Sequence, residues 1–486
     1  MNIQRSVRLI PLLVLVVLAC LACLVFRPDK ALRVATGSAA HDLCSETFVA
    51  HLDPTRIFRE SLAPRPGFRV VAPLMTWTVD RPAQAVRASF HGILESRAAF
   101  RQGFGCVLFD AAAGVASLPA PLPAPLPAPL PGPTADQAPT PALNAAANPA
   151  PSATSSPVET ADPGLKQALD AAFAEPGVGP KRWTTAVVVL HAGRIVAERY
   201  APGYGPDTPI LGFSMTKSVT NALVGILVRE GRLVVEARAP IDAWSDATDP
   251  RRAITLEQLM RMDSGLDLDE TGSGFDPSNL MFYVEPDMAA YAERARPIAA
   301  PGTRWHYSSA STHLVARVVR DAVGGTGQAV QEFARHELFA PLGMEHVTLE
   351  MDASGTPIGA HYMLASARDW ARLGWLYAED GMVGGRRILP PGWARWSATP
   401  TLDTDYGAGF WTNQGQHPHA LARIRLGLPA EAFFASGNLG QRIAIIPSEH
   451  LVIVRTGHSH GEDYDMEGFL ALVRACRLAL GTAGKT

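Results

Sequence analysis

The sequence predicts an α+β fold in which a central antiparallel sheet is built from both ends of one domain, with an all-helical part inserted between them. Residues 184–200 alternate as two strands around a turn at 192–194, and residues 441–456 repeat this pattern. An apolar helix follows over 466–480. Strands at both ends and helices between them favour one closed sheet flanked by terminal helices. The inserted helices are expected over 214–230, 254–262, 311–323, 328–338 and 365–379.

Length and charge limit the classes of function. With 486 residues the chain is long enough for two or three domains. Its formal net charge is -3, whereas proteins that bind nucleic acid usually carry a basic footprint. We therefore expect no nucleic-acid partner.

The first 28 residues predict export. Residues 9–26 are apolar throughout and follow Arg5 and Arg8. Eighteen residues lie near the lower limit for crossing a bilayer, and basic residues ahead of them place the N-terminus in the cytoplasm. We expect a signal anchor over 1–28 in the inner membrane, with a single pass and a periplasmic catalytic domain. The alternative is a cleaved signal peptide or a lipoprotein signal near Cys20 or Cys23, and export follows in both cases.

Composition divides the rest of the chain. Residues 29–117 form a small N-terminal region with no assignable chemistry, and 118–160 are a Pro/Ala-rich linker that favours extended polyproline II. Residues 161–486 form the main domain. Cys44 and Cys106 lie before the linker, and they are either free thiols or a disulfide, which an oxidising compartment favours.

A serine and a lysine one helical turn apart are the strongest chemical signal. Lys217 is one of five lysines in a chain with 38 arginines, and it follows Ser214 by three residues. A desolvated lysine can lose its proton, whereas an arginine cannot. The pair therefore predicts a nucleophilic serine with a proton acceptor beside it. The alternative is that Ser214 only caps a helix.

Two further segments favour catalysis. "TRWHYSSASTHLVARVV" (303–319) places Tyr307 just before a helix, and "FFASGNLGQRIAIIP" (433–447) is a strand of small residues that can approach a ligand closely. Together with Ser214 and Lys217 they supply a nucleophile, groups that handle protons, and donors for an oxyanion.

These segments in this order resemble the penicillin-recognising serine hydrolases: class C β-lactamases, DD-peptidases, related esterases and the 6-aminohexanoate-dimer (nylon-oligomer) hydrolases. The resemblance covers about 180–480 and is greatest to the last branch. It is carried by "SMTKS", "ITLEQLMRMDSGLDLDE", "WHYSS", "ASARDWARLGWLYAEDG" and "GNLGQRIAIIP". It implies a β-lactamase/transpeptidase-like fold and catalysis without a metal or cofactor.

The resemblance also implies roles. Ser214 would be the acylated nucleophile and Lys217 its proton partner. Tyr307 would be the base and acid that serves the leaving group, and the backbone N–H groups of Ser214 and Asn438 would form the oxyanion hole. The expected substrate-binding residues are Ser309, Ser436 and Gly437.

Two departures from the family pattern bear on the substrate. Ser309 stands where asparagine is usual, and 435–437 read Ala-Ser-Gly in place of Lys-Thr-Gly. The missing lysine removes a cation that holds a substrate carboxylate, so we expect hydrolysis of a small ester or short amide. The alternatives are β-lactamase or DD-peptidase activity, and a non-catalytic protein that binds an envelope ligand.

Other candidate residues are weaker. His458, His460 and Asp463 could hold a metal ion, but an exposed polar turn explains them as well. Two further pairs, Asp263 with Ser264 and Asp276 with Tyr283, are expected near the cleft, either in packing or in shaping the substrate site.

Overall fold

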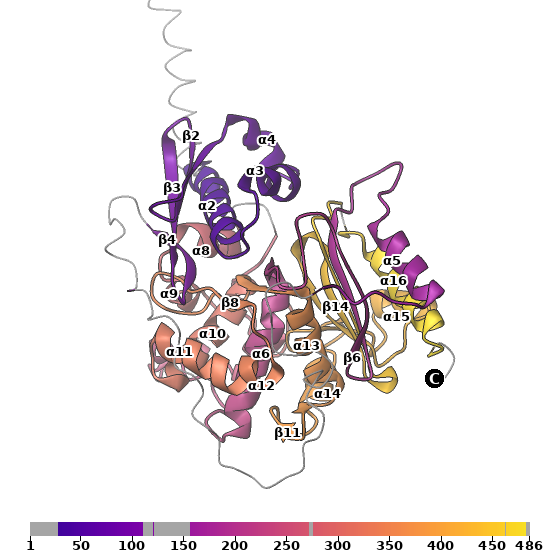
Figure 1. The fold of residues 1–486 in the computed structure, drawn as a ribbon. Helices are drawn as coiled ribbons and strands as arrows, with labels where there is room; N and C mark the ends of the chain where they lie inside the picture. The colour runs from indigo at the N-terminus through magenta and orange to yellow at the C-terminus, as the bar shows by residue number, and fades with distance from the viewer. Residues whose placement is uncertain (1–27, 110–119, 121–155, 272–275, 462, 483–486) are drawn as a thin grey trace, which may run out of the picture.

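A computed structural model describes residues 28–109, 120, 156–271, 276–461 and 463–482 (Figure 1). The apolar segment over 9–26 and most of the linker lie outside these residues. None of the helices that the structure does describe is long and apolar enough to cross a membrane. The division into an N-terminal region, a linker and a main domain stays a prediction.

The main domain contains a six-stranded antiparallel sheet within the described residues. Its strand order is β12-β13-β14-β15-β5-β6, so the two predicted hairpins meet at β15 and β5. Both hairpins are confirmed, with turns after His191 and Ile446. The strands are β5 (Thr184–His191), β6 (Arg194–Tyr200), β12 (Trp411–Thr412), β13 (Phe433–Gly437), β14 (Gln441–Ile446) and β15 (Leu451–Gly457).

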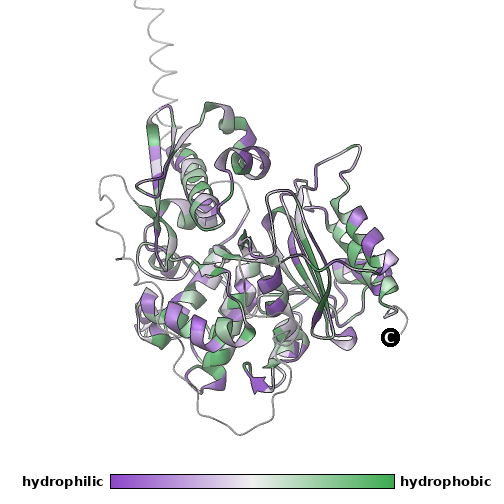
Figure 2. Ribbon diagram, in the orientation of Figure 1, coloured by the Kyte–Doolittle hydropathy of each residue, from purple (hydrophilic) through white to green (hydrophobic). Residues whose placement is uncertain are grey.

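Side chains alternate between two cores across this sheet. Val188 and Val454 face α13 (Ala367–Ala378) and the helical part, while Val187 and Ile453 face the pair α5 (Pro163–Phe173) and α16 (Met466–Ala479). Figures 1 and 2 show this layering, with hydrophobic strands between α13 and the two outer helices. A period of two places alternate residues on opposite faces of a strand. Each face of this sheet therefore has its own core, and helices cover both faces.

The inserted part is mainly helical, as predicted. The expected helices are present, although the first begins with a 3-10 turn before α6. The helices are α6 (Thr216–Arg229), α7 (Leu256–Arg261), α8 (Pro277–Val284), α9 (Met288–Glu293), α10 (Ser309–Val323), α11 (Gly327–Ala334), α12 (Ala340–Leu342), α14 (Trp393–Ala398) and α15 (Pro418–Arg425). Short strands complete it: β7 (Ile210–Leu211), β8 (Val347–Leu349), β9 (Met363–Ala365), β10 (Met382–Val383) and β11 (Arg386–Arg387).

The N-terminal region forms a helix packed on a four-stranded antiparallel sheet. The helix α2 (Pro28–Phe48) lies between this sheet and α8 of the main domain (Figure 1). The sulfur atoms of Cys44 and Cys106 are bonded, which joins α2 to the last strand. The remaining elements are α3 (Pro54–Ile57), α4 (Phe68–Val71), β1 (Thr76–Asp80), β2 (Ala85–Phe90), β3 (Ile93–Arg101) and β4 (Gly105–Phe109).

A buried carboxylate connects this region to the main domain. Glu350, after β8, accepts hydrogen bonds from Ser45 Oγ (2.8 Å), from the Cys106 backbone N–H (2.8 Å) and from His41 Nε2 (2.9 Å). The same Nε2 lies 2.9 Å from the Cys106 carbonyl oxygen, which can only accept, so Nε2 carries the proton. Gly105 has a φ of +71°, and a Cβ there would lie 2.5 Å from Glu350 Cγ. We call Glu350, His41, Ser45 and Cys106 the interface cluster.

Candidate active site

Ser214 lies in a tight turn where the sheet meets the helical part. The turn is a 3-10 helix over Phe213–Met215 that leads into α6, and Phe213 has a φ of 47°. A positive φ at an aromatic residue is strained, and such strain gathers at functional sites. The end of β13 packs here, since a Cβ on Gly437 would lie 2.2 Å from the Gly212 carbonyl oxygen. This close approach explains the glycine at 437.

Asn438, the other expected oxyanion donor, follows directly at this corner. It begins a 3-10 turn over Asn438–Gly440, and its side-chain oxygen accepts a hydrogen bond from the Leu439 N–H (3.0 Å). The segments that carry the two expected donors, Ser214 and Asn438, therefore meet where β13 ends beside Gly212.

Lys217 is buried beside the Ser214 hydroxyl. Only 2% of its surface is exposed, and Nζ lies 3.0 Å from Ser214 Oγ. Its other contacts are Ser309 Oγ at 2.9 Å and the Ala360 carbonyl oxygen at 3.0 Å, which are both neutral acceptors. Burial lowers the pKa of Lys217 to about 8, against an opposing effect of Glu270. A substantial fraction of the lysine is therefore neutral at mildly alkaline pH.

Tyr307 lies close to both Lys217 and the Ser214 hydroxyl. Lys217 Nζ is 4.9 Å from the centre of the Tyr307 ring. Burial and, to a smaller extent, Glu270 raise the pKa of Tyr307, while its hydrogen bond with Ser214 acts in the opposite direction. The phenol is therefore protonated at neutral pH and can donate a proton.

Ser309 contacts the lysine directly. It is fully buried, and its Oγ accepts a hydrogen bond from Lys217. Its backbone N–H donates to Glu270 Oε2 at 2.7 Å. The side chain is therefore placed to orient the lysine, and its contact with a substrate stays a prediction.

Glu270 is a charged neighbour that sequence reasoning did not single out. It lies at the end of the 254–270 segment and accepts from the first N–H of α10, a position where a carboxylate is favoured by the helix dipole. Its charge raises the pKa values of both Lys217 and Tyr307. No spacing rule predicts this contact, because 39 residues separate Glu270 from Ser309 and α8 and α9 lie between them.

Aromatic side chains form a wall beside Tyr307. Trp411 stacks on Tyr307 with ring centres 5.7 Å apart and an interplanar angle of 21°. Tyr406 meets Tyr307 edge-on at 5.6 Å and Trp411 at 5.0 Å. Trp305 packs on Tyr406 at 5.8 Å. We call Trp305, Tyr406 and Trp411 the aromatic wall, and its apolar faces suit an uncharged part of a substrate.

The Arg442 guanidinium contacts the Ser436 hydroxyl. The sequence suggested that replacing lysine by Ala435 leaves this strand without a positive charge. Arg442 is the cross-strand partner of Ser436, and its guanidinium donates a hydrogen bond to Ser436 Oγ. Burial lowers the pKa of Arg442 to about 10, so it remains charged at neutral pH. The hairpin between β13 and β14 could have indicated this pairing, since a short connection fixes the register.

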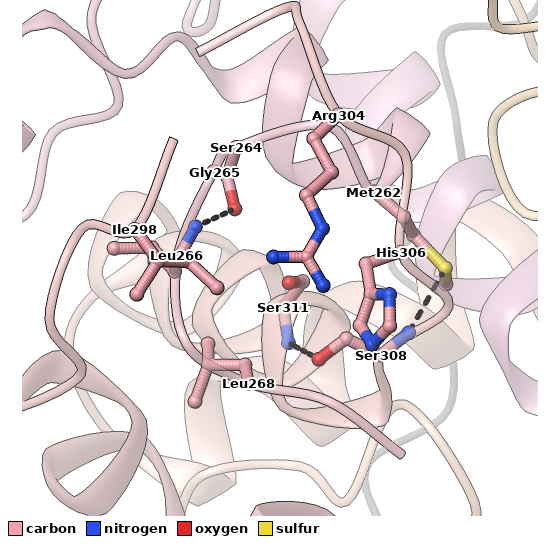
Figure 3. Close-up of a pocket in the computed structure, with 10 residues that line it drawn as sticks. All are labelled: Met262, Ser264, Gly265, Leu266, Leu268, Ile298, Arg304, His306, Ser308 and Ser311. Carbon is pink, nitrogen blue, oxygen red and sulfur yellow. Dashed lines mark hydrogen bonds between the residues drawn. The ribbon is translucent and has the colours of Figure 1, made fainter. Parts of the chain in front are cut away.

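A small cavity lies next to the segment that carries Tyr307. Ser214, Lys217 and Tyr307 are not among its lining residues. Its volume is about 10 Å³, which is room for about one water molecule. Figure 3 shows Arg304 and His306 at this cavity, with Ser308 capping Ser311. It is lined by Met262, Ser264, Gly265, Leu266, Leu268, Ile298, Arg304, His306, Ser308 and Ser311.

The weaker candidates have structural surroundings. His458 Nε2 lies 3.1 Å from the Tyr204 hydroxyl, and His460 Nε2 lies 2.8 Å from the Glu60 carbonyl oxygen of the N-terminal region. Among the described residues these histidines and Asp463 do not form a metal-binding group.

The pairs Asp263 with Ser264 and Asp276 with Tyr283 also have structural surroundings. Asp276 caps α8, and the Tyr283 hydroxyl lies 3.4 Å from that of Tyr362. Burial raises the pKa of Asp263 to about 6, and Ser264 lines the small cavity.

The sheet, the inserted helices and the buried serine–lysine pair define the serine hydrolases of the β-lactamase fold. Residues 169–473 match the family model described as Beta-lactamase. This is more than half of the chain, which therefore belongs to the beta-lactamase family, as the sequence resemblance implied.

Individual relatives include hydrolases and a penicillin-binding homologue. A 6-aminohexanoate-dimer hydrolase of Paenarthrobacter ureafaciens is 26% identical over 226 residues, so the match spans 43% of this chain and 56% of that protein. A putative 6-aminohexanoate-dimer hydrolase structure from Bacillus anthracis is 23% identical, with a TM-score of 0.52, covering 69% of this chain and 88% of that one. A penicillin-binding protein homologue from Caulobacter crescentus is 20% identical, with a TM-score of 0.50, covering 65% and 96%. These two structures share the fold.

Proposed function

We propose that the protein is an exported serine hydrolase that cleaves an ester or a short amide through an acyl-enzyme on Ser214. The observation that carries this proposal is the buried Lys217 ammonium group, 3.0 Å from Ser214 Oγ and partnered otherwise by neutral acceptors. A purely structural lysine would be expected to pair with a carboxylate in such a buried site. The relative that hydrolyses a 6-aminohexanoate dimer, by its name, supports a short amide as one substrate class.

Acylation begins with the neutral lysine. Two N–H hydrogens stay on Ser309 Oγ and the Ala360 carbonyl, which leaves the nitrogen lone pair directed at the Ser214 hydroxyl. Lys217 takes the hydroxyl proton while Ser214 Oγ attacks the substrate carbonyl carbon. The carbonyl oxygen gains negative charge, which the backbone N–H groups of Ser214 and Asn438 would stabilise.

Collapse of this intermediate breaks the bond to the leaving group. Tyr307, whose pKa is raised, donates its phenolic proton to the departing alkoxide or amine nitrogen. The proton on Lys217 then restores Tyr307. A water molecule next attacks the acyl carbon and gives one proton to Lys217. The bond from that carbon to Ser214 Oγ then breaks, and Ser214 Oγ takes this proton back from Lys217 as the carboxylic acid leaves. The raised pKa favours the acid part of the role that the family resemblance gives to Tyr307.

Replacement of Ser214 tests this proposal directly. Ser214→Ala should abolish hydrolysis of p-nitrophenyl butyrate and labelling by a fluorophosphonate, while the circular dichroism spectrum and melting temperature stay unchanged. Ser245→Ala, at an exposed serine, is the matched control. Activity above a few per cent in the Ser214 variant would remove the serine from its role. An unlabelled, inactive wild-type protein would favour the non-catalytic binding protein instead.

Export is part of the proposal. The apolar residues 9–26 and the bonded pair Cys44 and Cys106 support it, because disulfides persist in oxidising compartments. A reporter fused after residue 160 should be active only outside the cytoplasm, and the protein should stay with membranes after a high-salt wash. A soluble periplasmic product that begins near residue 28 would show that the segment is cleaved rather than retained as an anchor.

β-Lactamase or DD-peptidase activity is the second candidate, and Arg442 is the observation that favours it. Because Arg442 donates to Ser436 Oγ, the Ser436 hydrogen is left to donate to a carboxylate on the substrate. Hydrolysis of nitrocefin, an aminohexanoate dimer and p-nitrophenyl butyrate on one preparation decides between the candidates. We expect ester hydrolysis with weak nitrocefin turnover, since lysine is absent at Ala435. Efficient nitrocefin turnover with a negligible ester rate would reverse the assignment.

Arg442→Met sharpens this test. A charge-assisted hydrogen bond contributes about 1.5–3 kcal/mol, so KM for a substrate that bears a carboxylate should rise about 10- to 100-fold. The neutral ester should change by less than about threefold. Arg442 also donates to the Asp463 carbonyl, so the melting temperature of the variant must be measured alongside. Equal losses on charged and neutral substrates would assign Arg442 to packing only.

A further inference from the structure

Two histidines and an aspartate lie close together near the aromatic wall, on the segments before and after β12. Asp405 precedes β12, while His417 and His419 flank Pro418 at the start of α15. One ligand atom from each of the three lies within 4.8 Å of the others. His417 Nδ1 is 3.3 Å from Asp405 Oδ1, and His419 Nδ1 is 4.0 Å from Asp405 Oδ2.

The ligand atom of His417 is enclosed but makes no hydrogen bond. His417 Nδ1 is buried and lies 3.3 Å from Asp405 Oδ1, with which it forms an ion pair when the imidazole is protonated. When the imidazole is neutral and carries its proton on Nε2, Nδ1 has a lone pair that can bind a cation. A cation between these two atoms would use both the lone pair and the carboxylate.

The carboxylate is held in place from behind. Arg423 NH2 donates to Asp405 Oδ2 (2.9 Å), and the same guanidinium contacts Asn413 Oδ1 (2.7 Å) and the Thr412 carbonyl (2.7 Å). Asp405 is 4% exposed and Arg423 is also buried. Hydrogen-bonded outer partners of this kind orient the ligands of metal sites.

The donor set selects the kind of ion. Two imidazoles and one carboxylate are typical zinc ligands, with Zn–N and Zn–O distances of about 2.0–2.2 Å. Ligand atoms at those distances around a tetrahedral ion lie about 3.3–3.5 Å apart. The contact between His417 and Asp405 already has that length, and the exposed His419 side chain has room to close the remaining gap.

We propose that Asp405, His417 and His419 bind one zinc ion, with water as the fourth ligand. The ion stabilises the loop that bears two members of the aromatic wall, Tyr406 and Trp411. These residues adjoin Asp405 and Thr412, and the Asp405 carbonyl accepts a hydrogen bond from the Thr412 N–H (2.9 Å). The ion takes no part in the chemistry at Ser214. The proposal stands independently of the proposed hydrolysis.

Metal content and thermal stability test the site. The full chain, purified without a polyhistidine tag and stripped with EDTA, is dialysed against zinc and its metal content is measured. We expect one equivalent of zinc in the wild type and in Ser214→Ala, and none in His417→Ala/His419→Ala. The control His51→Asn/His91→Asn removes two exposed histidines elsewhere and should keep one equivalent. Zinc should raise the melting temperature of the wild type and the control by about 3–6 °C.

Cobalt distinguishes coordination from adventitious binding. Co²⁺ added to the stripped wild type should give visible absorption of a four-coordinate ion, and His419→Ala should weaken its binding at least tenfold. Equal zinc in the wild type and the double variant would overturn the proposal. So would a melting temperature that does not respond to zinc, which would leave His417 and Asp405 as an ion pair only.

Discussion

Two buried polar clusters in this protein treat charge in opposite ways. The interface cluster surrounds the Glu350 carboxylate with three donors, from His41, Ser45 and the Cys106 backbone. The second cluster, which we call the lysine cluster, surrounds the Lys217 amine with three neutral oxygen acceptors from Ser214, Ser309 and Ala360, and the pKa of Lys217 falls to about 8. Donors that converge on a carboxylate fix its charge, whereas neutral acceptors leave an amine able to lose its proton.

Burial alone therefore does not mark a reactive group. Both side chains are almost fully buried, and both are hydrogen-bonded. They differ in whether their partners hold the charged form, and only the lysine has a nucleophile within reach. Substitutions that change the charge or the proton affinity in one cluster or the other test this difference.

The largest effect is expected in the lysine cluster. Lys217→Arg keeps the positive charge but cannot accept the Ser214 proton, so kcat/KM for p-nitrophenyl butyrate should fall by about 10²–10⁴. The exposed Lys181→Arg is the control for the same exchange. A loss below about fivefold, with normal folding, would make Lys217 a counter-charge rather than a base.

The interface cluster should respond in stability rather than in chemistry. Glu350→Gln removes the charge that three donors share, and we expect the free energy of unfolding to fall by about 2–4 kcal/mol. The exposed Glu345→Gln should change it by less than about 0.5 kcal/mol. Urea unfolding measures both, and kcat on the folded variants should stay within about threefold of wild type. Unchanged stability together with lost activity would reverse the roles of the two clusters.

The smallest effect concerns the pH profile. In the proposed mechanism the neutral form of Lys217 is the base, so kcat/KM should rise with pH through a midpoint near 8. Glu270 stabilises the protonated lysine and raises its pKa. Glu270→Gln should therefore move this acid limb to lower pH. The partly exposed Asp267→Asn should leave the limb in place. A shift to higher pH would contradict the electrostatic role of Glu270.

The fold class and the closeness of Ser214 to Lys217 could be predicted from the sequence alone. Hydrophobic alternation gave the two hairpins, and the i, i+3 spacing of Ser214 and Lys217 placed both groups on one helical turn, because 3.6 residues per turn bring such neighbours together. The choice of lysine in an arginine-rich chain indicated a titratable amine. These inferences depend on near neighbours in the chain.

Tertiary structure decided the contacts between distant segments. Nothing in the sequence near Glu350 indicates that α2 supplies its donors, since His41 lies 309 residues away. The contact of Glu270 with the first N–H of α10 and the packing of the aromatic wall also join segments that lie far apart in the chain. The packing of α10 against α6 likewise brings Ser309 Oγ to Lys217, from which it is separated by 92 residues. Long-range packing fixes which groups face one another, and short-range periodicity carries no information about it.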